Sequence, residues 1–422
     1  MQLFKLTNNL SKITNRQAET NTAVTETVRK ILDDIKAYGD TALRQYIERF
    51  DGYTGASLLA SPDEIAAGVH NAGEEFMGIL QRAAAQITEY HANQTEKSWG
   101  VYKDNGVIMG QLVCPLARVA LYVPGGTAAL PSTVLMTAIP ARLAGVEDLA
   151  IFTPVKADGK VPDVILAAAA CCGINKIYKI GGAQAIAAAA YGTETIEKAD
   201  KIVGPGNIYV ATAKQLVYGA VDIDMIAGPS EILIIADETA NPKYIAADML
   251  SQAEHDEMAS AILVTTSQKI IDETEMELAR QLAYLNRKDI AEISLANYGA
   301  AVLVDNIDQA FDISNEIAPE HLEILTENPL EKLPKVKNAG SIFLGENTPE
   351  PLGDYMSGTN HVLPTGGTAK FSSPLGVYDF VKYSAYSYYP RQVLAEIKDD
   401  VTKFAELEGL DAHANSVRVR FE

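Results

Sequence analysis

Glu320 and His321 are adjacent in the sequence and combine a carboxylate with an imidazole. Such a pair can take a proton from an alcohol and, separately, from water. The pair follows Pro319, between a predicted helix over 306–317 and a predicted strand over 321–326. Junctions of this kind are where α/β folds place reactive groups. An exposed dipeptide at the start of a strand is the simpler alternative, so the pair alone indicates only a candidate site.

Gln252 and His255 are candidate metal ligands. They lie three residues apart at the end of a predicted helix over 242–255, so both side chains project from one face. Asn241 and Pro242 supply a cap and a first residue for this helix. An amide oxygen and an imidazole nitrogen can bind one metal ion. The alternative is a histidine that only interacts with the helix C-terminus. On this pair alone that alternative is favoured, because glutamine is an uncommon zinc ligand.

Further polar groups lie toward the end of the chain. Residues 353–361 (GDYMSGTNH) are rich in glycine and polar side chains, and long loops of this kind are often functional. Asp354 offers an oxygen ligand, and His361 offers a further donor or a substrate contact. Glu408 and His413 lie in the C-terminal tail and could close a pocket from outside the main body.

The remaining histidines and the cysteines are weaker candidates. His70 and His91 have no acidic or amide partner at ligand spacing, so we expect surface or packing histidines. Cys114, Cys171 and Cys172 have no nearby histidine or cluster of cations that would lower a thiol pKa. We therefore expect buried, inert thiols without disulfides, as in a protein of the reducing cytoplasm.

The elements that position these groups are predicted to be alternating strands and helices. Residues 22–97 should be mostly helical, because apolar residues recur there at three- and four-residue spacing. The predicted strands are 118–123, 148–153, 176–181, 201–204, 231–237, 260–266, 299–305, 321–326 and 340–345, and the predicted helices are 132–144, 184–191, 206–219, 242–255, 268–285 and 306–317. This alternation is typical of parallel sheets covered on both faces, and so many strands indicate two sheets.

The C-terminal part is predicted to form a separate tail. Residues 365–376 (TGGTAKFSSPLG) have the composition of a linker. A helix over about 391–408 follows, and the alternating Val417, Val419 and Phe421 indicate a short final strand. A tail joined through such a linker could dock on another subunit.

Glycine-rich turns are candidates for cofactor binding. The usual dinucleotide fingerprint, Gly-x-Gly-x-x-Gly with an acidic residue at the right distance, does not follow any predicted strand. Three other turns follow strands and lead into helices: 123–126 (VPGG), 181–184 (GGAQ) and 204–207 (GPGN). Their backbone amides could face an anion such as pyrophosphate. Alone, they indicate a ligand near the strand ends.

Length and charge limit the class of protein. A chain of 422 residues is too long for one simple core, so two or more lobes are expected. The formal net charge of −20 disfavours nucleic acid and anionic membranes as partners and suits a small cationic substrate. The N-terminus lacks the apolar core and cleavage site of a signal peptide, and the longest apolar stretch, 164–174, is too short for a membrane span. We expect a cytoplasmic protein.

Several of these segments together resemble the histidinol dehydrogenase family. The matching segments are LYVPGG (121–126), IGGAQAIA (180–187), VGPGN (203–207), AGPSE (227–231), LSQAEH (250–255), APEHL (318–322) and GDYMSGTNHVLPT (353–365), with Glu408 and His413 in the tail. They occur in the family's order and at compatible spacings from about residue 107 to the end. The combined set is highly specific, which favours the functional interpretation of each weak local signal.

The resemblance implies a role for each matching position. The implied zinc ligands are Gln252, His255, Asp354 and His413, and the implied catalytic acid–base pair is Glu320 and His321. Substrate contacts are implied for the four zinc ligands together with Ser230, His321 and Glu408, and NAD contacts for Tyr122, Gln184 and Asn207.

The resemblance also implies an α/β fold of two incomplete Rossmann-like parallel-sheet domains with small terminal extensions, in an intertwined homodimer. We expect an N-terminal extension over 1–20, a first domain over 21–121 plus 231–370 with most of the metal and catalytic residues, an NAD-binding domain over 122–230, and a tail over 371–422 that docks on the partner subunit.

The implied reaction is the oxidation of L-histidinol, through L-histidinaldehyde, to L-histidine with two NAD, the final steps of histidine biosynthesis. One zinc ion per subunit would position the substrate. His321 would act as general base, and Glu320 would activate water. Two oxidations at one carbon explain the use of an adjacent acid–base pair, and no thiolate is required.

Three other functions stay open from the sequence. A zinc- and NAD-dependent dehydrogenase of the same scaffold could act on another small polyol or hydroxy compound. A zinc hydrolase would fit the four ligands equally well, but it would leave the glycine-rich turns unexplained. A non-catalytic metal-binding protein would not require Glu320 and His321 beside the metal.

Overall fold

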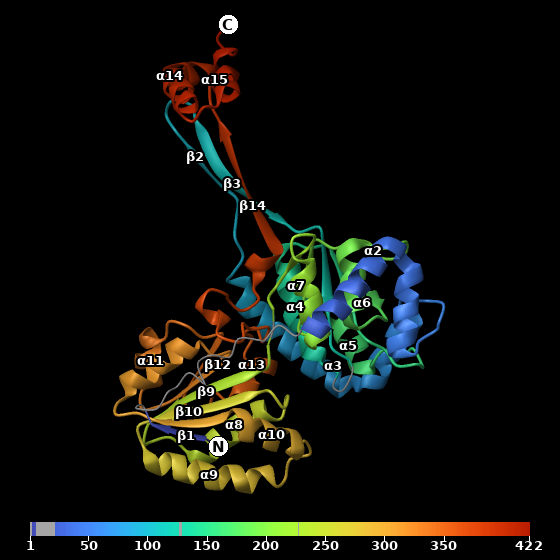
Figure 1. The fold of residues 1–422 in the computed structure, drawn as a ribbon, viewed down its shortest axis with the longest axis vertical. Helices are drawn as coiled ribbons and strands as arrows, with labels where there is room; N and C mark the ends of the chain where they lie inside the picture. The colour runs from blue at the N-terminus through green and yellow to red at the C-terminus, as the bar shows by residue number, and fades with distance from the viewer. Residues whose placement is uncertain (1, 6–21, 126–128, 227) are drawn as a thin grey trace. The chain divides into compact units, whose positions relative to one another are not determined.

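The chain divides into two compact units. A computed structural model describes residues 2–5, 22–125, 129–226 and 228–422. The first unit comprises Met1–Gln94 with Leu116–Phe380, and the second comprises Thr95–Pro115 with Val381–Glu422. Figure 1 shows the helices and strands of both units.

The first unit contains a five-stranded parallel sheet. Its strands are β4 (Arg118–Tyr122), β5 (Asp148–Phe152), β6 (Lys176–Tyr178), β7 (Lys201–Val203) and β8 (Asp222–Ile223), in the order β6-β5-β4-β7-β8. The connecting helices are α4 (Pro131–Ala144), α5 (Asp163–Cys171), α6 (Gly182–Tyr191) and α7 (Ile208–Val217). The predicted strands in this region are confirmed. The chain builds the sheet outward from β4 in both directions, so a topological switch point lies between β4 and β7.

Two long N-terminal helices cover the faces of this sheet. Helix α2 (Thr22–Asp51) packs against α6 and α7, and α3 (Pro62–Ala92) packs against α4 and α5. Alternate residues of β4 point to the two faces, so Ala120 and Tyr122 belong to the core beneath α2, whereas Val119 and Leu121 belong to the core beneath α3. This packing differs from the expected grouping of residues 21–121 with 231–370, because the apolar stripes of both helices are buried on the five-stranded sheet.

The first unit also contains a six-stranded parallel sheet. Its strands are β1 (Gln2–Lys5), β9 (Glu231–Ala236), β10 (Ser260–Thr265), β11 (Gly299–Leu303), β12 (His321–Leu325) and β13 (Ser341–Leu344), in the order β1-β11-β10-β9-β12-β13. The helices of this part are α8 (Pro242–Ala253), α9 (Gln268–Leu282), α10 (Lys288–Tyr298), α11 (Ile307–Ile317), α12 (Pro329–Lys332) and α13 (Glu350–Tyr355). The prediction of two parallel sheets is therefore confirmed. Of the expected extension over 1–20, residues 2–5 form the edge strand β1, and residues 6–20 lie outside the described chain.

The two faces of the six-stranded sheet carry different helices (Figure 1). Helices α8, α9 and α10 share one hydrophobic core, and α11 contributes to the core on the other face. Leu322 and Ile324 of β12 point toward α11. Because side chains alternate along a strand, His321 and Glu323 point to the face that α8 covers.

The second unit is a three-stranded antiparallel sheet with two helices. Its strands are β2 (Trp99–Tyr102), β3 (Ile108–Pro115) and β14 (Val381–Tyr388), in the order β14-β3-β2, and its helices are α14 (Arg391–Leu407) and α15 (Asp411–Arg418). The tail helix was predicted, but the antiparallel strands were not. The predicted final strand at 417–421 is wrong, because α15 continues to Arg418 and buries Ala414 at helical spacing.

The segment over 365–376 is not a linker. Thr365 and Leu375 are buried. The backbone N–H of Gly228 donates to Thr365 Oγ1 at 2.5 Å, and the N–H of Leu375 donates to the carbonyl of Val362 at 3.0 Å. This segment therefore folds onto the first unit, and the C-terminal part of the second unit begins only after Phe380.

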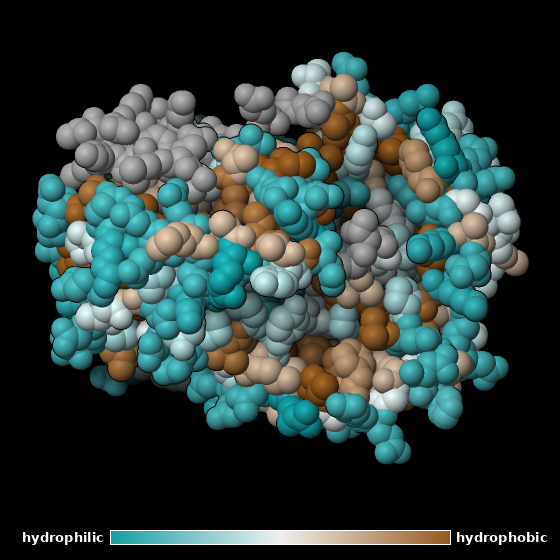
Figure 2. All heavy atoms as spheres, turned by 90° about the horizontal axis from the view of Figure 1, so that it is seen from below, coloured by the Kyte–Doolittle hydropathy of each residue, from teal (hydrophilic) through white to brown (hydrophobic). Residues whose placement is uncertain are grey.

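The face drawn in Figure 2 carries mainly hydrophilic residues, with hydrophobic ones in small groups among them. Over the residues that the structure describes, none of the helices combines the length and apolar composition needed to cross a membrane.

A buried ion pair fixes the glycine-rich turn after β7. Lys214 and Asp224 are 2% and 1% exposed and form a salt bridge. Lys214 Nζ donates to the carbonyl of Gly204 at 2.9 Å, and the N–H of Gly204 donates to Asp224 Oδ2 at 2.7 Å. Gly204 has φ +115°, and a Cβ there would lie 2.1 Å from the Tyr122 carbonyl oxygen. The turn is therefore held from both sides and admits only glycine at this position.

We predict that Lys214→Met lowers the free energy of unfolding by about 3–5 kcal/mol, because it leaves the Asp224 carboxylate buried without its cation. Urea unfolding followed by circular dichroism measures the effect. The matched control is Lys176→Met, whose ion pair with Asp148 is partly exposed and contributes about 0–1 kcal/mol. Equal destabilisation by the two variants would contradict the prediction.

Candidate active site

The acid–base pair lies at the start of β12 and is anchored to the start of β9. Both side chains are buried. The N–H of Glu231 donates to Glu320 Oε2 at 2.9 Å, and His321 Nδ1 lies 3.0 Å from the Glu231 carbonyl oxygen. A carbonyl oxygen can only accept, so Nδ1 carries the hydrogen and Nε2 keeps its lone pair.

The chain reaches this position through a tight turn. Ala318 ends α11 in the left-handed conformation, with φ 54°. Gly340 allows the close approach of the next strand, since a Cβ there would lie 2.5 Å from the Glu320 carbonyl oxygen. Ser341 N–H donates to that same oxygen at 2.8 Å. The backbone of Glu320 is therefore fixed on both sides.

Burial shifts both groups toward their neutral forms. Desolvation lowers the pKa of His321 to about 4, with a further lowering by His255 and an opposing effect of the Glu231 carbonyl. Desolvation also raises the pKa of Glu320 well above its usual value, and the nearby Glu231, Asp354 and Glu350 add to this shift. At neutral pH His321 is thus an uncharged base with Nε2 available.

Carboxylates of α13 face the same imidazole. Glu350 Oε1 lies 3.5 Å from His321 Nε2. Possible metal-ligand atoms of His321, Glu350 and Asp354 all lie within 4.8 Å of one another. Burial and the charge of Glu350 raise the pKa of Asp354 to about 8. Gly353 lets α13 approach β13, because a Cβ there would lie 2.6 Å from the Phe343 ring.

Glu350 was missed in the sequence analysis. The available signal was its four-residue spacing from Asp354, which places both side chains on one face of a helix. The loop prediction over 353–361 hid this signal, since α13 begins at Glu350 and already includes Asp354.

Gln252 lies in the last turn of α8 beside these carboxylates. Its side chain is 1% exposed, and neither of its polar atoms meets full hydrogen-bond geometry with a described residue. Burial raises the pKa of Glu350, and His255 and the nearby Gln252 amide oppose this shift. A buried amide without a good partner is costly, so a ligand at its oxygen would satisfy it.

His255 lies just beyond the helix. The predicted helix over 242–255 ends at Ala253, and the N–H of His255 donates to the Gln252 carbonyl at 3.1 Å. The side chain is exposed. Gln252 and His255 therefore do not share one face of a helix, although this was expected. His255 still lies near enough to influence the pKa of Glu350 and of His321.

These donors fit a divalent cation. Amide oxygen, carboxylate oxygen and imidazole nitrogen form the ligand set that zinc accepts, and the orphaned Gln252 amide lies beside the carboxylates. Glu408 and His413 belong to the second unit, and both are exposed there. The expected part of Glu408 and His413 in the site stays a prediction.

Two further expected positions flank the pair. Ser230 directly precedes β9, and its carbonyl accepts from the N–H of Ser260 at 2.9 Å. His361 is half-buried, and its Nε2 is shielded from solvent without a hydrogen-bond partner among the described residues. Burial, with His321 as the next cause, lowers the pKa of His361 to about 4.

The expected nucleotide contacts lie on the five-stranded sheet. The N–H of Gly182 donates to the Tyr122 hydroxyl at 3.0 Å, and Gln184 Nε2 donates to Asp51 Oδ2 at 3.4 Å. Asn207 caps α7 by accepting from two backbone amides. The turns 181–184 and 204–207 thus open α6 and α7 near the switch point. Of the turn over 123–126, residue 126 lies outside the described chain, as does residue 227 of the AGPSE segment.

The weaker candidates behave as predicted, except that the three cysteines are only partly buried. His91 is fully buried, with Nδ1 2.9 Å from the Ile87 carbonyl oxygen. All cysteines are free. Burial raises the pKa of Cys171, and it raises the pKa of Cys172 to about 12, so neither is a thiolate at neutral pH.

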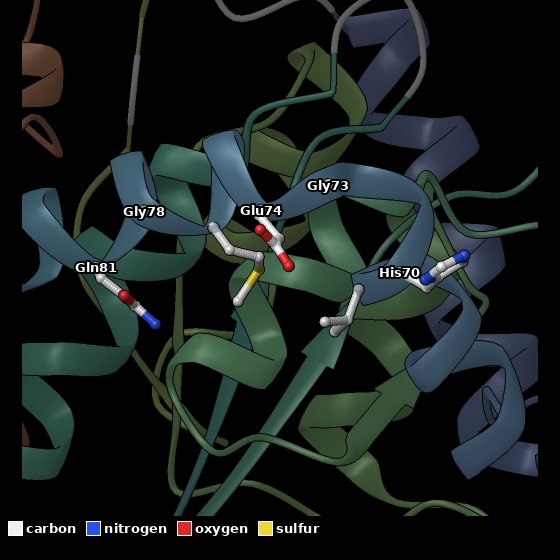
Figure 3. Close-up of a pocket in the computed structure, with 7 residues that line it drawn as sticks. His70, Gly73, Glu74, Gly78 and Gln81 are labelled. Atoms are coloured by element: carbon white, nitrogen blue, oxygen red, sulfur yellow. The ribbon is translucent and has the colours of Figure 1, made fainter.

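A groove lies on α3 (Figure 3). Its volume is about 380 Å³, and it is lined by Val69, His70, Gly73, Glu74, Met77, Gly78 and Gln81. All of these residues come from one helix, which is interrupted at Gly73. None of the expected site residues lines it.

Comparison with known proteins identifies relatives along nearly the whole chain. The family model described as histidinol dehydrogenase matches residues 14–421. Histidinol dehydrogenase of Lactococcus lactis subsp. lactis (strain IL1403) is 61% identical over 420 residues, which are 99% of this chain and 97% of that protein. Histidinol dehydrogenase of Clostridium acetobutylicum is 55% identical, covering 96% of this chain and 94% of that protein. The crystal structure of histidinol dehydrogenase from Elizabethkingia anophelis matches with a TM-score of 0.94 at 40% identity, covering 100% of this chain and 98% of that one.

We predict that a divalent cation releases a proton from Asp354 when it binds. Since the pKa of Asp354 is raised to about 8, the carboxyl is protonated at pH 7 until a cation displaces the proton. The affinity of the metal-free protein for Zn²⁺ should therefore rise between about pH 6 and 8, by up to roughly tenfold per unit. Calorimetry in buffers of different ionisation enthalpy measures the release, and Asp354→Asn should release about one proton fewer. An affinity independent of pH over this range would contradict the prediction.

Proposed function

The chain belongs to the histidinol dehydrogenase family, and from this premise we propose that it oxidises L-histidinol through L-histidinaldehyde to L-histidine, the final steps of histidine biosynthesis. Two NAD molecules are the oxidants, and each receives one hydride from the same carbon. The observation that carries the proposal is the neutral His321, whose free Nε2 faces the carboxylates of α13. The free cysteines fit an enzyme of the reducing cytoplasm.

His321 acts as the base of both oxidations. Its Nδ1–H is bonded to the Glu231 carbonyl, so the ring is oriented and Nε2 accepts the proton of the substrate hydroxyl while hydride leaves the same carbon for NAD. The first step yields the aldehyde. After Nε2 has released this proton to solvent and water has added to the aldehyde, Nε2 accepts a proton from the hydrate as a second hydride leaves. The products are the carboxylate, two NADH and three protons.

Glu320 activates the water between the two oxidations. The carboxyl is held by the N–H of Glu231. Burial and neighbouring carboxylates raise its pKa. The neutral form must therefore release its proton first, and the carboxylate that results is a stronger base than an exposed one. Because Glu320 lies next to His321, His321 can accept the proton of the alcohol while Glu320 activates water.

Gln252, His255, Asp354 and His413 are the residues that would hold zinc. When bound, the ion would supply a fixed positive charge that orients the substrate. The buried Gln252 amide without a well-formed partner and the protonated Asp354 beside Glu350 support this assignment. Ser230 and Glu408 would contact the substrate together with the ligands and His321.

NAD would bind on the five-stranded sheet, with contacts to Tyr122, Gln184 and Asn207. The support is that Gln184 and Asn207 lie at the turns that open α6 and α7, and that Tyr122 ends β4, one of the two strands at the topological switch point. The Tyr122 hydroxyl is already oriented by the N–H of Gly182.

We further propose a homodimer in which the second unit completes the partner's site. This unit exposes large apolar side chains at three-residue spacing along α14, where Phe404 and Leu407 are 68% and 77% exposed. Exposed apolar groups in such a row are typical of protein interfaces. Glu408 and His413 directly follow this row, so docking of α14 would carry both residues to the neighbouring subunit.

We predict that His321→Asn removes most turnover and leaves the zinc content unchanged, because the residue acts as a base and is not a proposed ligand. Metal analysis and NADH formation measure the two effects. Glu320→Gln should slow aldehyde oxidation more than alcohol oxidation, since only the former needs water. Full activity of His321→Asn would reject the base assignment, and equal slowing of both steps by Glu320→Gln would reject its role with water.

We predict that two inactive variants restore activity when their subunits are mixed. A site built from His321 of one subunit and His413 of the other is intact once in each hybrid of His321→Asn with His413→Ala. After denaturation and random reassembly, about a quarter of all sites are native, and activity should recover to about that fraction. As a control, mixing His321→Asn with Glu320→Gln leaves every site damaged. Equal recovery in both mixtures would contradict a shared site.

A further inference from the structure

Two buried carboxyl groups behind the site have no part in the proposed chemistry. Asp248 belongs to α8 and Glu323 belongs to β12, and Glu323 is 0% exposed. Their side chains lie within reach of a mutual hydrogen bond, and Glu323 Oε2 has no other partner among the described residues. Two carboxyl groups can form such a bond only when one of them holds a proton. Burial favours that proton. Desolvation raises the pKa of Asp248 to about 6, with Glu323 opposing this shift and Glu350 adding to it, and desolvation together with the charge of Asp248 raises the pKa of Glu323 well above its usual value.

This pair connects the two helices that carry proposed metal ligands. Asp248 lies four residues before Gln252 in α8. Glu323 Oε1 accepts from the N–H of Glu350, the first residue of α13, at 2.8 Å, and Asp354 lies four residues further along α13. A second link runs parallel to it, since the Ser251 hydroxyl lies 3.2 Å from Glu350 Oε2.

We propose that Asp248 and Glu323 share one proton and act as a brace that sets the distance between α8 and α13, and thereby the positions of Gln252 and Asp354. Neither residue touches the substrate or the reacting atoms, so both are positioning residues. The inference rests on the proposed metal site and adds the groups that preorganise it. Residues that orient metal ligands typically contribute 10- to 100-fold to metal affinity.

Burial makes the shared proton necessary for this arrangement. Two ionised carboxylates in contact, shielded from water, would repel one another and would lack solvation. With one proton, the pair carries a single negative charge, and one Glu323 oxygen remains available to the N–H of Glu350. An amide in place of either carboxyl reproduces both features, because its NH₂ donates to the remaining carboxylate and the net charge is unchanged.

The test compares Glu323→Ala with Glu323→Gln in the full-length, metal-stripped enzyme. Competition with a chromogenic chelator measures the affinity for Zn²⁺ alone, without any assay of activity. We expect Glu323→Ala to weaken binding by 10- to 100-fold, and we expect Glu323→Gln and Asp248→Asn to stay within about threefold of the parent. Phe311→Leu is the matched control, because Phe311 is a core residue of α11 on the opposite face of the sheet. It should lower thermal stability and leave zinc affinity unchanged.

The outcomes separate this inference from the proposed function. If the parent enzyme binds no zinc, the proposed metal site fails. If the parent binds zinc and Glu323→Ala binds it equally well, the brace is overturned. A loss of tenfold or more in Glu323→Gln would overturn the shared proton. Should Glu323→Ala not fold, the Zn²⁺ affinities of Asp248→Ala and Asp248→Asn give the same comparison from the side of α8. The Zn²⁺ affinity of Glu323→Gln still tests the shared proton.

Discussion

The hydrogen bond between His321 Nδ1 and the Glu231 carbonyl is the contact on which the rest of the site depends. It assigns the proton to Nδ1, leaves Nε2 as the base and orients the ring toward α13. The bond exists because β9 and β12 are parallel neighbours in a register that pairs His321 with Ile232. A slip of one residue would turn the imidazole to the opposite face. The apolar strands beneath the site therefore set its chemistry.

A second constraint is electrostatic. Glu320, Glu350 and Asp354 gather around His321, and all three have raised pKa values, with burial as the main cause. Such a group of acids cannot ionise fully without a compensating cation. A metal ion together with a positively charged substrate would provide that compensation. Asp354, whose pKa is raised to about 8, holds its proton at neutral pH, whereas His321, whose pKa is lowered to about 4, stays neutral and is available as a base.

Sequence reasoning identified most of this architecture, and its errors have physical causes. Continuous apolar strands predicted both parallel sheets, and the predicted position of Glu320 and His321 at the start of a strand was correct. The amphipathic stripes of α2 and α3 predicted helices but could not say which sheet would cover them. Val417, Val419 and Phe421 fit both a strand and a helical turn, and the burial of Ala414 decides for the helix. Glu350 was missed because its role depends on β12 and α13, which meet only in the folded chain. The zinc and NAD residues came from the family resemblance.

The most direct test of the central claim is the stoichiometry of NADH formed from histidinol. The zinc-loaded enzyme is mixed with a limiting amount of L-histidinol and excess NAD, and absorbance at the NADH wavelength is followed to completion, with and without prior removal of metal by a chelator. We expect two NADH for each histidinol from the loaded enzyme and none after chelation. One NADH per histidinol, or undiminished turnover without metal, would contradict a single site in which a neutral His321 serves two successive oxidations beside a bound cation.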